Sequence, residues 1–463
     1  MYRLILLMVC LVQLSGCTRS HLDIFPPLDD PSLVNKMIPA DQLRADIDAL
    51  VEGVLLRHPD LSGYTRLADV QAAATELKQQ IDGPMTRVAF FRLVGQLSHH
   101  FNDGHSFLIW PYQEYNALVG DGAQGFPFHL ERTPFGLFIK HAYQQGEQHI
   151  AAGTRVLSIN GVDSETLMDT AQRYVGGETR LLREHTVAAR FAPMLWSVFG
   201  FIDEFALELA NEQGATTLMV RSGDNWQLSD DAGAQGNAEH YYKRLKPGVG
   251  YLYIGSFDTD PDQFETFIDQ TFTSVQDDQL QHLIVDIRDN TGGNTDAPAY
   301  LSRYLANKPF SMVSSVKEKL NPDNRGWLDH KGDIGDIIRQ PWNETLEPMA
   351  NGRRFGGNTW LLVSPLSYSA AIVFATTLQD NGFATLIGQT TGGYANQTAQ
   401  GNLFNLPHSQ LRAYVATRLL VRPSGDTTVG GVVPDIIIEK NQAALTSGQD
   451  IELDAALAAI ENR

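Results

Sequence analysis

The stretch "SPLSYSAAIVFATTLQDNG", residues 364–382, decides how the C-terminal half of the chain is interpreted. It overlaps an apolar run, "NTWLLVSP" (358–365), which predicts a buried strand. Apolar residues then recur with helical spacing, and Asn381-Gly382 supplies a helix end. The sharp strand-to-helix turn places Ser369 at a helix N-terminus, where backbone N–H groups and the helix dipole favour negative charge. This position suits a nucleophilic serine, and it also suits a serine that only caps a helix.

Strand-like runs and helical stretches alternate through the rest of this half. The runs read "VGYLYIGSF", "LIVDIRDNTGG", "NTWLLVSP" and "FATLIGQTTGG". This alternation predicts βαβ units and a largely parallel, buried sheet. Two runs end in paired glycines, Gly292-Gly293 and Gly392-Gly393, which let backbone N–H groups approach a ligand closely, although either pair alone would be an ordinary loop. Because ligands gather beyond the carboxyl ends of parallel strands, we expect these turns and Ser369 to share one rim.

The earlier part of the chain divides into two regions of different pattern. Residues 41–112 carry helical periods and close with "NDGHSFLIW", where a turn feeds a short strand. Residues 113–240 begin with a hairpin pattern around Thr-Pro-Phe-Gly and continue with "AAGTRVLSINGVDSETL", a strand, turn and helix. The predicted division is therefore an N-terminal helical domain (41–112), a module with a helical insertion (113–240) and an α/β domain (241–463).

The first twenty residues, "MYRLILLMVCLVQLSGCTRS", have one basic residue, an apolar core and small residues before a cysteine. This pattern predicts a secretory leader, and its "LSGC" ending resembles a bacterial lipoprotein signal. We expect a signal peptide over 1–16, lipid on Cys17, and a Pro-rich tether over 17–40. The alternatives are a plain signal peptide or a chance cysteine. Cys10 and Cys17 are the two cysteines of the chain, so the mature protein is expected to have neither a disulfide nor a thiol nucleophile.

The net charge of the chain argues against some classes of binding partner. With a formal net charge of −19, the chain is a poor match for nucleic acid, and solubility is the simplest explanation of the charge. A lipid anchor would place the protein in the cell envelope, facing the periplasm and most naturally on the outer membrane. The expected partners are a peptide or protein substrate and the membrane. The sequence does not indicate an oligomeric state.

Several motifs occur in an order that resembles a known family. "LIVDIRDNTGG", "SPLSYSAAIVFATTLQD", "LIGQTTGG" and "GGVVPDIII" are similar to the core of the tail-specific and C-terminal processing serine peptidases and their tricorn-like and retinoid-binding-protein-like relatives. "AAGTRVLSINGVDSETL" resembles half of the PDZ-like module of these proteins, and "FNDGHSFL" resembles their upstream Asp-Gly-His segment. The resemblance covers most of the mature chain. It implies a crotonase-like α/β spiral core, beside a PDZ-like module and the helical domain.

The resemblance also implies roles for particular residues. Ser369 is the expected nucleophile, and the backbone amides of Gly293 and Ala370 are the expected oxyanion donors. The processing branch uses a lysine about two dozen positions after its serine, but no lysine occurs here between Ser369 and Lys440. A weak hydroxyl nucleophile needs a base within hydrogen-bond reach. The resemblance to the tricorn-like branch makes His105 that base, whereas His99 and His100 are interpreted as helix-end residues carrying charge rather than as metal ligands.

Two questions stay open at this level. The third catalytic member is Asp426, Asp103 or none, because Thr427, Thr428 and Val429 stand where the relatives carry a glutamate. The function is either that of a serine peptidase without metal or cofactor, or that of a ligand- or peptide-binding protein on the same fold. The peptidase is the leading interpretation, although the missing lysine and the unassigned acid lend weight to the second one, and a fold does not fix a function.

Overall fold

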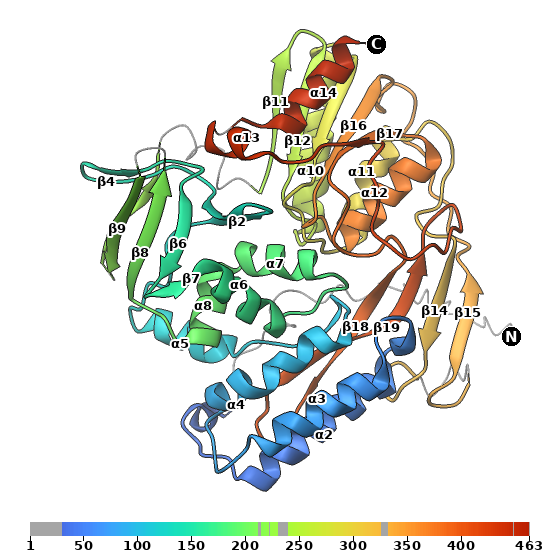
Figure 1. Ribbon diagram of the computed structural model, residues 1–463. Helices are drawn as coiled ribbons and strands as arrows, with labels where there is room; N and C mark the ends of the chain where they lie inside the picture. Colours follow the sequence, from blue (N-terminus) through green and yellow to red (C-terminus); the bar gives the residue numbers. More distant parts are fainter. Residues whose placement is uncertain are drawn as a thin grey trace, which may run out of the picture.

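The computed structural model of the chain describes residues 30–211, 214–221, 223–229, 239–325, 332–447 and 449–462. The expected signal peptide, Cys17 and the first part of the tether lie outside these residues. No helix in the described part is both long and apolar enough to cross a membrane. The described chain forms three larger sheets and one small three-stranded sheet, with helices packed around them (Figure 1).

A six-stranded sheet forms the centre of the C-terminal region. Its spatial order is β11 (His240–Lys246), β12 (Val249–Ile254), β13 (His282–Asp286), β16 (Asn358–Val363), β17 (Ala384–Gly388) and β20 (Ile436–Ile437). From β12 onward all neighbours are parallel, and β11 pairs with β12 antiparallel at the edge. The predicted, largely parallel sheet is therefore confirmed.

Both faces of this sheet are covered. On one face, Leu283 and Val285 join a core built with α10 (Pro261–Asp277), α11 (Asp296–Leu305) and α12 (Ala370–Asn381). On the other face, Ile284 packs in a core with α14 (Ile451–Glu461). Because successive side chains of a strand point to opposite faces, a strand buried on both faces is a continuous apolar run. This explains the unbroken apolar runs that identified these strands in the sequence.

A second, antiparallel sheet connects the two ends of the chain, and the sequence analysis did not predict it. Its strands are β1 (Ser106–Leu108), β14 (Ser315–Lys319), β15 (Ile337–Pro341), β18 (Gln397–Asn405) and β19 (Arg412–Val421). Strand β1 pairs with β19, with Ser106 opposite Val415. The N-terminal helix α2 (Ala40–Arg57) packs against this sheet, as Figure 1 shows. The N-terminal region therefore shares its core with strands from residues 397–421.

The middle region holds a third sheet with the order β2-β3-β6-β8-β9. Its strands are β2 (Leu130–Thr133), β3 (Gly136–Ile139), β6 (Arg155–Ile159), β8 (Glu204–Asn211) and β9 (Gly214–Arg221), with β7 (Val162–Asp163) paired to β6. The predicted hairpin and the strand–turn–helix ending in α6 (Ser164–Ala171) are confirmed, whereas the PDZ-like assignment stays a prediction. Phe90 and Phe91 of the N-terminal region share one core with Leu137 and Val156, so packing crosses the expected boundary at residue 112.

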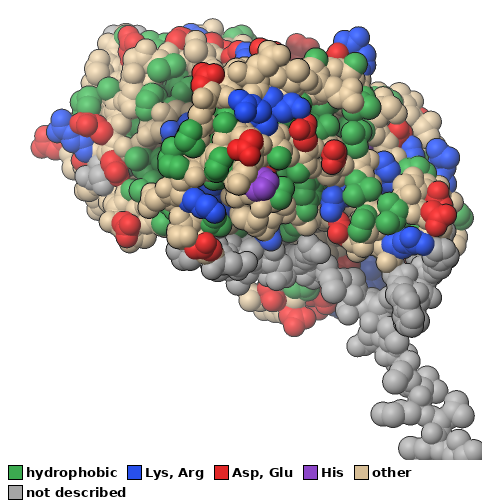
Figure 2. Space-filling view, turned by 90° about the horizontal axis from the view of Figure 1, so that it is seen from below, with side chains coloured by type: hydrophobic (Ala, Val, Ile, Leu, Met, Phe, Trp, Pro, Cys, Tyr) green, Lys and Arg blue, Asp and Glu red, His purple; other side chains and the backbone are tan. Residues whose placement is uncertain are grey.

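The remaining elements complete the periphery. They are η1 (Pro31–Val34), η2 (Leu61–Gly63), α3 (Leu67–Gln79), α4 (Arg87–Val94), η3 (Gly95–Phe101), α5 (Tyr112–Gly120), β4 (Tyr143–Gln145), β5 (Gln148–Ile150), η4 (Gln172–Tyr174), α7 (Arg180–Ala189), α8 (Phe191–Phe199), β10 (Gln227–Leu228) and α13 (Gln442–Ser447). Acidic and basic side chains are interspersed on the face shown in Figure 2, which is the pattern of an ordinary solvated surface.

Candidate active site

Ser369 lies on a tight turn between β16 and α12. Its φ and ψ angles are 54° and −120°, a strained combination for a residue with a side chain. Its side chain makes no capping hydrogen bond to α12, although it occupies the N-cap position, so the capping alternative does not describe it. The residue is partly exposed. A serine on a strained strand-to-helix turn, with its hydroxyl free of the helix, is typical of a nucleophile.

His105 reaches Ser369 from the opposite side of the site. Its Nε2 lies 2.9 Å from Ser369 Oγ. The backbone of His105 is fixed, because its N–H donates to Asp103 Oδ1 at 3.0 Å and its carbonyl accepts from the Ala416 N–H of β19 at 2.8 Å. Burial lowers the pKa of His105 below 6.5, and the charge of Asp103 opposes this shift. A neutral imidazole at hydrogen-bond distance from the hydroxyl can accept its proton at neutral pH.

Two hydroxyl groups lie behind the imidazole ring. His105 Nδ1 is 3.2 Å from Thr398 Oγ1 and 2.9 Å from the hydroxyl oxygen of Tyr368. Thr398 donates its own hydrogen to Asp103 Oδ1 at 2.5 Å, so Thr398 Oγ1 presents a lone pair to the ring. Tyr368 donates to Glu178 Oε1 at 3.1 Å. These directions assign the hydrogen to Nδ1 of His105 and leave Nε2 free to accept from Ser369.

Asp103 lies at the centre of this network and is fully buried. It accepts hydrogen bonds from Ser106 Oγ at 2.6 Å and from His58 Nε2 at 3.1 Å. The hydrogen of His58 is on Nε2, because its Nδ1 accepts from the Asp60 N–H at 3.1 Å. Burial acts to raise the pKa of Asp103, but the hydrogen bonds from His58 and Ser106 act in the opposite direction and outweigh it. The pKa therefore lies well below 3.8, and Asp103 is ionised at neutral pH.

Asp426, the other acid considered in the sequence, has a different environment. It is exposed on the loop that follows β19, and its carboxylate accepts from the N–H and the hydroxyl of Thr428 at 2.9 and 2.7 Å. The imidazole partners are Thr398 and Tyr368 instead. Of the two candidates, the structure therefore connects Asp103 with His105, through one hydroxyl group.

The glycine turns converge on Ser369, as predicted. Gly292 has φ +101°, and a Cβ atom on it would lie 2.6 Å from Ser369 Cβ and 3.0 Å from the Ala370 nitrogen. The N–H of Gly292 donates to Asn290 Oδ1 at 2.8 Å, so it is occupied. Within the described residues, no protein acceptor is recorded for the N–H groups of Gly293 or Ala370. A Cβ on Gly393 would lie 2.4 Å from the Tyr368 ring, so the second glycine pair also lies at this rim.

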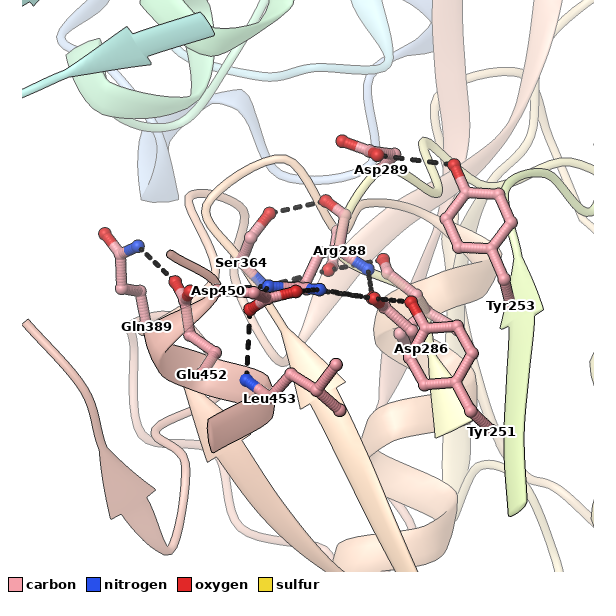
Figure 3. A network of polar contacts seen from close by, with 12 residues as sticks. Tyr251, Tyr253, Asp286, Arg288, Asp289, Ser364, Gln389, Asp450, Glu452 and Leu453 are labelled. Atoms are coloured by element: carbon pink, nitrogen blue, oxygen red, sulfur yellow. Dashed lines mark hydrogen bonds and ion pairs between the residues drawn. The ribbon is translucent and has the colours of Figure 1, made fainter. Parts of the chain in front are cut away.

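A network of polar contacts surrounds Arg288, four residues before Gly292 (Figure 3). The guanidinium bonds both oxygens of Asp450 at 2.7 Å and Asp286 Oδ2 at 2.6 Å. The Arg288 carbonyl accepts from Ser364 Oγ at 2.5 Å, just before the turn that carries Ser369. Arg288 thereby joins the end of β13, the start of α14 and the approach to α12. This rigid frame supports the geometry of the Gly292–Gly293 turn.

A cavity of about 740 Å³ lies next to this network, between the middle region and the parallel sheet. Tyr241, Tyr251 and Tyr253 form part of its wall, and neither Ser369 nor His105 contributes to its lining. Lys440 also lines this cavity, where it pairs with Glu131. No lysine therefore replaces the missing lysine of the processing branch within hydrogen-bond reach of Ser369 in the described chain.

The other histidines of the upstream segment have structural positions. His99 and His100 lie in η3, and their rings contact each other at a centroid distance of 4.0 Å. Both lie in the last turn of η3, as the helix-end interpretation predicted, but burial lowers the pKa of His99 to about 4, so this ring is not a cation at neutral pH. Among the described residues, no group of three His, Cys, Asp or Glu side chains is arranged to hold a metal ion.

Four residues of the site were not identified from the sequence. They are His58, Glu178, Tyr368 and Thr398. Tyr368 was adjacent to the predicted nucleophile, and that adjacency was the available signal. The other three come from segments far apart in the chain, where a lone histidine, a glutamate after two glycines and a threonine in a polar strand carry no local pattern.

A serine at the rim of a largely parallel sheet, with a histidine nitrogen 2.9 Å from its hydroxyl oxygen and the backbone amides of Gly293 and Ala370 nearby, is an arrangement that nucleophilic hydrolases use. Comparison with protein families agrees with this class. Residues 248–438 match the model of peptidase family S41, and this similarity spans the parallel sheet and Ser369.

The individual proteins that resemble this chain have low sequence identity to it. A carboxyl-terminal-processing protease of Picosynechococcus sp. is 24% identical over 216 residues, which cover 45% of this chain and 44% of the relative. The chain thus matches less than half the length of that protein. Among solved structures, mature CPAF complexed with lactacystin superposes with a TM-score of 0.65 at 14% identity, covering 90% of this chain and 97% of CPAF. A putative peptidase from Parabacteroides merdae gives a TM-score of 0.50 at 16% identity, with 90% and 96% covered. At these identities the structures show a shared fold alone.

Proposed function

We propose that this protein is a serine peptidase of the cell envelope, in which Ser369 attacks a peptide carbonyl and His105 takes its proton. The observation that carries the proposal is the 2.9 Å separation between His105 Nε2 and Ser369 Oγ. The two residues are 264 positions apart in the sequence, and each is held in place by its own surroundings. A lysine is not needed when an imidazole occupies the position of the base.

The chemistry follows from the assigned hydrogens. Ser369 Oγ forms a bond to the carbonyl carbon while its proton moves to His105 Nε2. The N–H groups of Gly293 and Ala370 are directed to the oxyanion, and each such donor contributes about 3 kcal/mol in a transition state. His105 then gives its proton to the leaving amine, which departs and leaves an acyl group on Ser369. Water, deprotonated by His105, releases the acyl group as a carboxylate.

Asp103 is the proposed third member, acting through Thr398. When His105 gains a proton, its Nδ1–H faces Thr398 Oγ1, which in turn donates to the ionised Asp103. The pair of hydrogen bonds holds the useful tautomer of the ring and stabilises the imidazolium. His58 and Ser106 support this role, because they donate to the other oxygen of the same carboxylate.

The module at residues 113–240 and the location are also part of the proposal. A PDZ-like module would present a peptide, including its C-terminal end, to Ser369. The leader pattern and Cys17 suggest a lipid anchor that faces the periplasm. Cell fractionation tests the location: the wild type is expected in the membrane fraction and Cys17→Ala in the soluble fraction. Equal distribution of both would contradict the anchor and leave the enzymatic proposal unaffected.

A fluorophosphonate probe tests the nucleophile and base directly. Such a probe reacts with serine hydroxyls that a base activates, and mass spectrometry locates the modified residue. We expect labelling at Ser369, no labelling in Ser369→Ala, and a rate at least about 10³-fold lower in His105→Ala. His149→Ala is the matched control, because His149 is exposed on β5 and is expected to leave the rate unchanged.

The same experiment distinguishes the peptidase from the alternative function, a ligand carrier. A folded wild-type protein that is not labelled would favour a ligand carrier, as would equal labelling of the wild type and His105→Ala. Hydrolysis of a peptide library by the wild type, and not by Ser369→Ala, then distinguishes a peptidase from a hydrolase of other esters or amides.

A further inference from the structure

The hydroxyl of Tyr368 is a second support for His105, and the proposed mechanism does not yet use it. It lies 2.9 Å from His105 Nδ1, slightly closer than Thr398 Oγ1 at 3.2 Å. The two rings also stack, with centroids 4.9 Å apart and planes inclined by 27°. The single hydrogen on Nδ1 therefore faces two oxygen atoms, each backed by a carboxyl group. Thr398 donates a hydrogen bond to Asp103, and Tyr368 donates one to Glu178.

The two carboxyl groups have different environments. Asp103 accepts four hydrogen bonds, from Thr398, His105 N–H, His58 and Ser106. Glu178 is also buried, yet its Oε2 has no hydrogen-bond partner. Its Oε1 accepts from Tyr368, but an ionised carboxylate with one buried oxygen left unpaired among the described residues is costly, so the charged form of Glu178 is disfavoured. Burial and the nearby negative charge of Asp103 raise the pKa of Glu178 to about 8.

No positive group neutralises Glu178 by direct contact within the described residues. Arg183 is a cation whose charge acts on Glu178, and its guanidinium donates to Gln172 Oε1 at 2.8 Å and to the Gly177 carbonyl at 2.8 Å. The titratable and charged groups whose fields couple to Glu178 are Tyr64, Asp103, Arg183, Tyr368 and Tyr394. Burial raises the pKa values of the three tyrosines, so they stay neutral, and Asp103 stays ionised. Glu178 is thus the group of this set that changes charge near neutral pH.

We propose that Glu178, acting through Tyr368, is a positioning residue whose loss of a proton increases the reactivity of Ser369. This inference rests on the proposed function and deepens it. When Glu178 is neutral, its acid proton competes for the oxygen of Tyr368. When it is ionised, it accepts the hydrogen of Tyr368 and leaves the tyrosine oxygen available to His105 Nδ1–H. The negative charge also stabilises the imidazolium that forms when Ser369 attacks. Both effects act in the same direction, and the proton of Glu178 leaves to solvent.

The pH dependence of fluorophosphonate labelling tests this proposal. In the wild type we expect two rising steps, one below pH 6.5 from His105 and one near pH 8 from Glu178. The second step is expected to be about tenfold, the effect of one charge-assisted hydrogen bond on a transition state. Tyr368→Phe keeps the ring stacking and removes the hydroxyl link, and Glu178→Gln removes the ionisation. Each variant is expected to lose the second step and keep the first.

The outcomes separate this inference from the proposed function. No labelling at Ser369 at any pH would overturn the proposed function itself. Labelling with one step in the wild type, or a second step that persists in both variants, would overturn the role of Glu178 alone. The double variant tests whether the residues act in series, since it is expected to match Tyr368→Phe. Thermal unfolding of each variant at pH 7 shows whether a lost second step is caused by lost folding. The size of the step is the ratio of the labelling rates above and below pH 8 in the same variant, so a lower overall rate does not change it.

Discussion

Ser369 is positioned by its backbone, whereas His105 is positioned by the side chains around it. The strained turn, the Gly292 contact and the start of α12 determine where the serine hydroxyl lies. The imidazole instead depends on Thr398 and Tyr368, whose own orientation depends on two buried carboxyl groups. A backbone turn offers one geometry, while hydrogen-bonded side chains also carry a protonation state. We call the turn at Gly292 and Ser369 the serine side of the site, and His105 with its hydrogen-bonded neighbours the histidine side. The serine side determines the geometry of the site, and the histidine side determines the pH range in which the site is reactive.

The largest effect is expected from the histidine side. In Asp103→Asn the amide would donate to Thr398, and the Thr398 hydroxyl would then turn its hydrogen toward His105 Nδ1. The ring would adopt the tautomer with hydrogen on Nε2, which cannot accept from Ser369. We expect labelling at Ser369 to fall about 10³-fold or more, by analogy with the loss of the acid in a serine–histidine–aspartate triad.

Asp426→Asn is the matched control for this change, because Asp426 was the alternative acid and is exposed. It is expected to keep the wild-type labelling rate. A comparable loss in Asp426→Asn, or a small loss in a folded Asp103→Asn, would remove Asp103 from the mechanism and leave the dyad without a third member.

A smaller effect is expected from the backbone side. Gly292→Ala places a Cβ atom 2.6 Å from Ser369 Cβ and 2.8 Å from the Tyr368 carbonyl, at φ +101°. The turn must open, which displaces the neighbouring Gly293 amide from the oxyanion position. We expect a loss of about 10²-fold in peptide hydrolysis, similar to removal of one oxyanion donor, with no shift in the pH midpoints because the side chains behind His105 are untouched.

Gly425→Ala controls for the strain of a positive φ. Gly425 has φ +76° and no atoms within 4 Å of the added Cβ, so the substitution carries backbone strain without a contact at the site. Its hydrolysis rate is expected to equal that of the wild type. If Gly292→Ala altered the pH profile as Asp103→Asn does, the proposed distinction between the two sides would not hold.

The smallest effect is expected on the free energy of unfolding. It tests the contrast between Glu178, which is protonated in the folded protein near neutral pH, and Asp103, which is ionised. The pKa of Glu178 is raised from 4.5 to about 8 in the folded protein, so the protonated form favours folding. The stability that it contributes is fully present below pH 4.5 and is lost as the pH rises toward 8. Glu178→Gln is therefore expected to unfold at a higher temperature than the wild type at pH 9, by the equivalent of ~2 kcal/mol, with a smaller difference at pH 5.

Thermal melts at both pH values measure this difference, and Glu76→Gln provides the control. Glu76 is exposed on α3, so its substitution is expected to give a difference that does not grow with pH. A Glu178→Gln difference that stayed constant from pH 5 to pH 9 would mean that Glu178 is ionised throughout this range.

The serine side could be predicted from the sequence because its signals are local. Apolar runs identified β13, β16 and β17, and the Asn381-Gly382 pair marked the end of α12. The paired glycines then indicated close backbone approach at the rim. The placement of Ser369 beyond the carboxyl end of β16 followed from the alternation of strands and helices, which requires no knowledge of distant segments.

The histidine side could not be predicted in the same way. His105 was inferred from resemblance alone, and its partners come from three distant segments of the chain. Thr398 lies in β18, whose sequence, "QTAQGNLFN", lacks an apolar alternation: its two buried side chains, Gln397 and Thr398, are polar, and the others are at most partly buried. Without that strand, the antiparallel sheet that brings Thr398 and Asp103 together was not visible. A buried polar network produces no periodic pattern in the sequence, because its side chains form hydrogen bonds with residues that are distant in the sequence.

The pairing of β1 with β19 has a consequence for biosynthesis. The strand that directly follows the proposed base, β1, reaches the ribosome exit early, but its partner, with Val415 opposite Ser106, is made more than three hundred residues later. Until then the imidazole has no anchor, and the serine has no base. A nascent chain that ends before β19 therefore cannot assemble the site, so the fold itself delays the proposed activity until synthesis is almost complete.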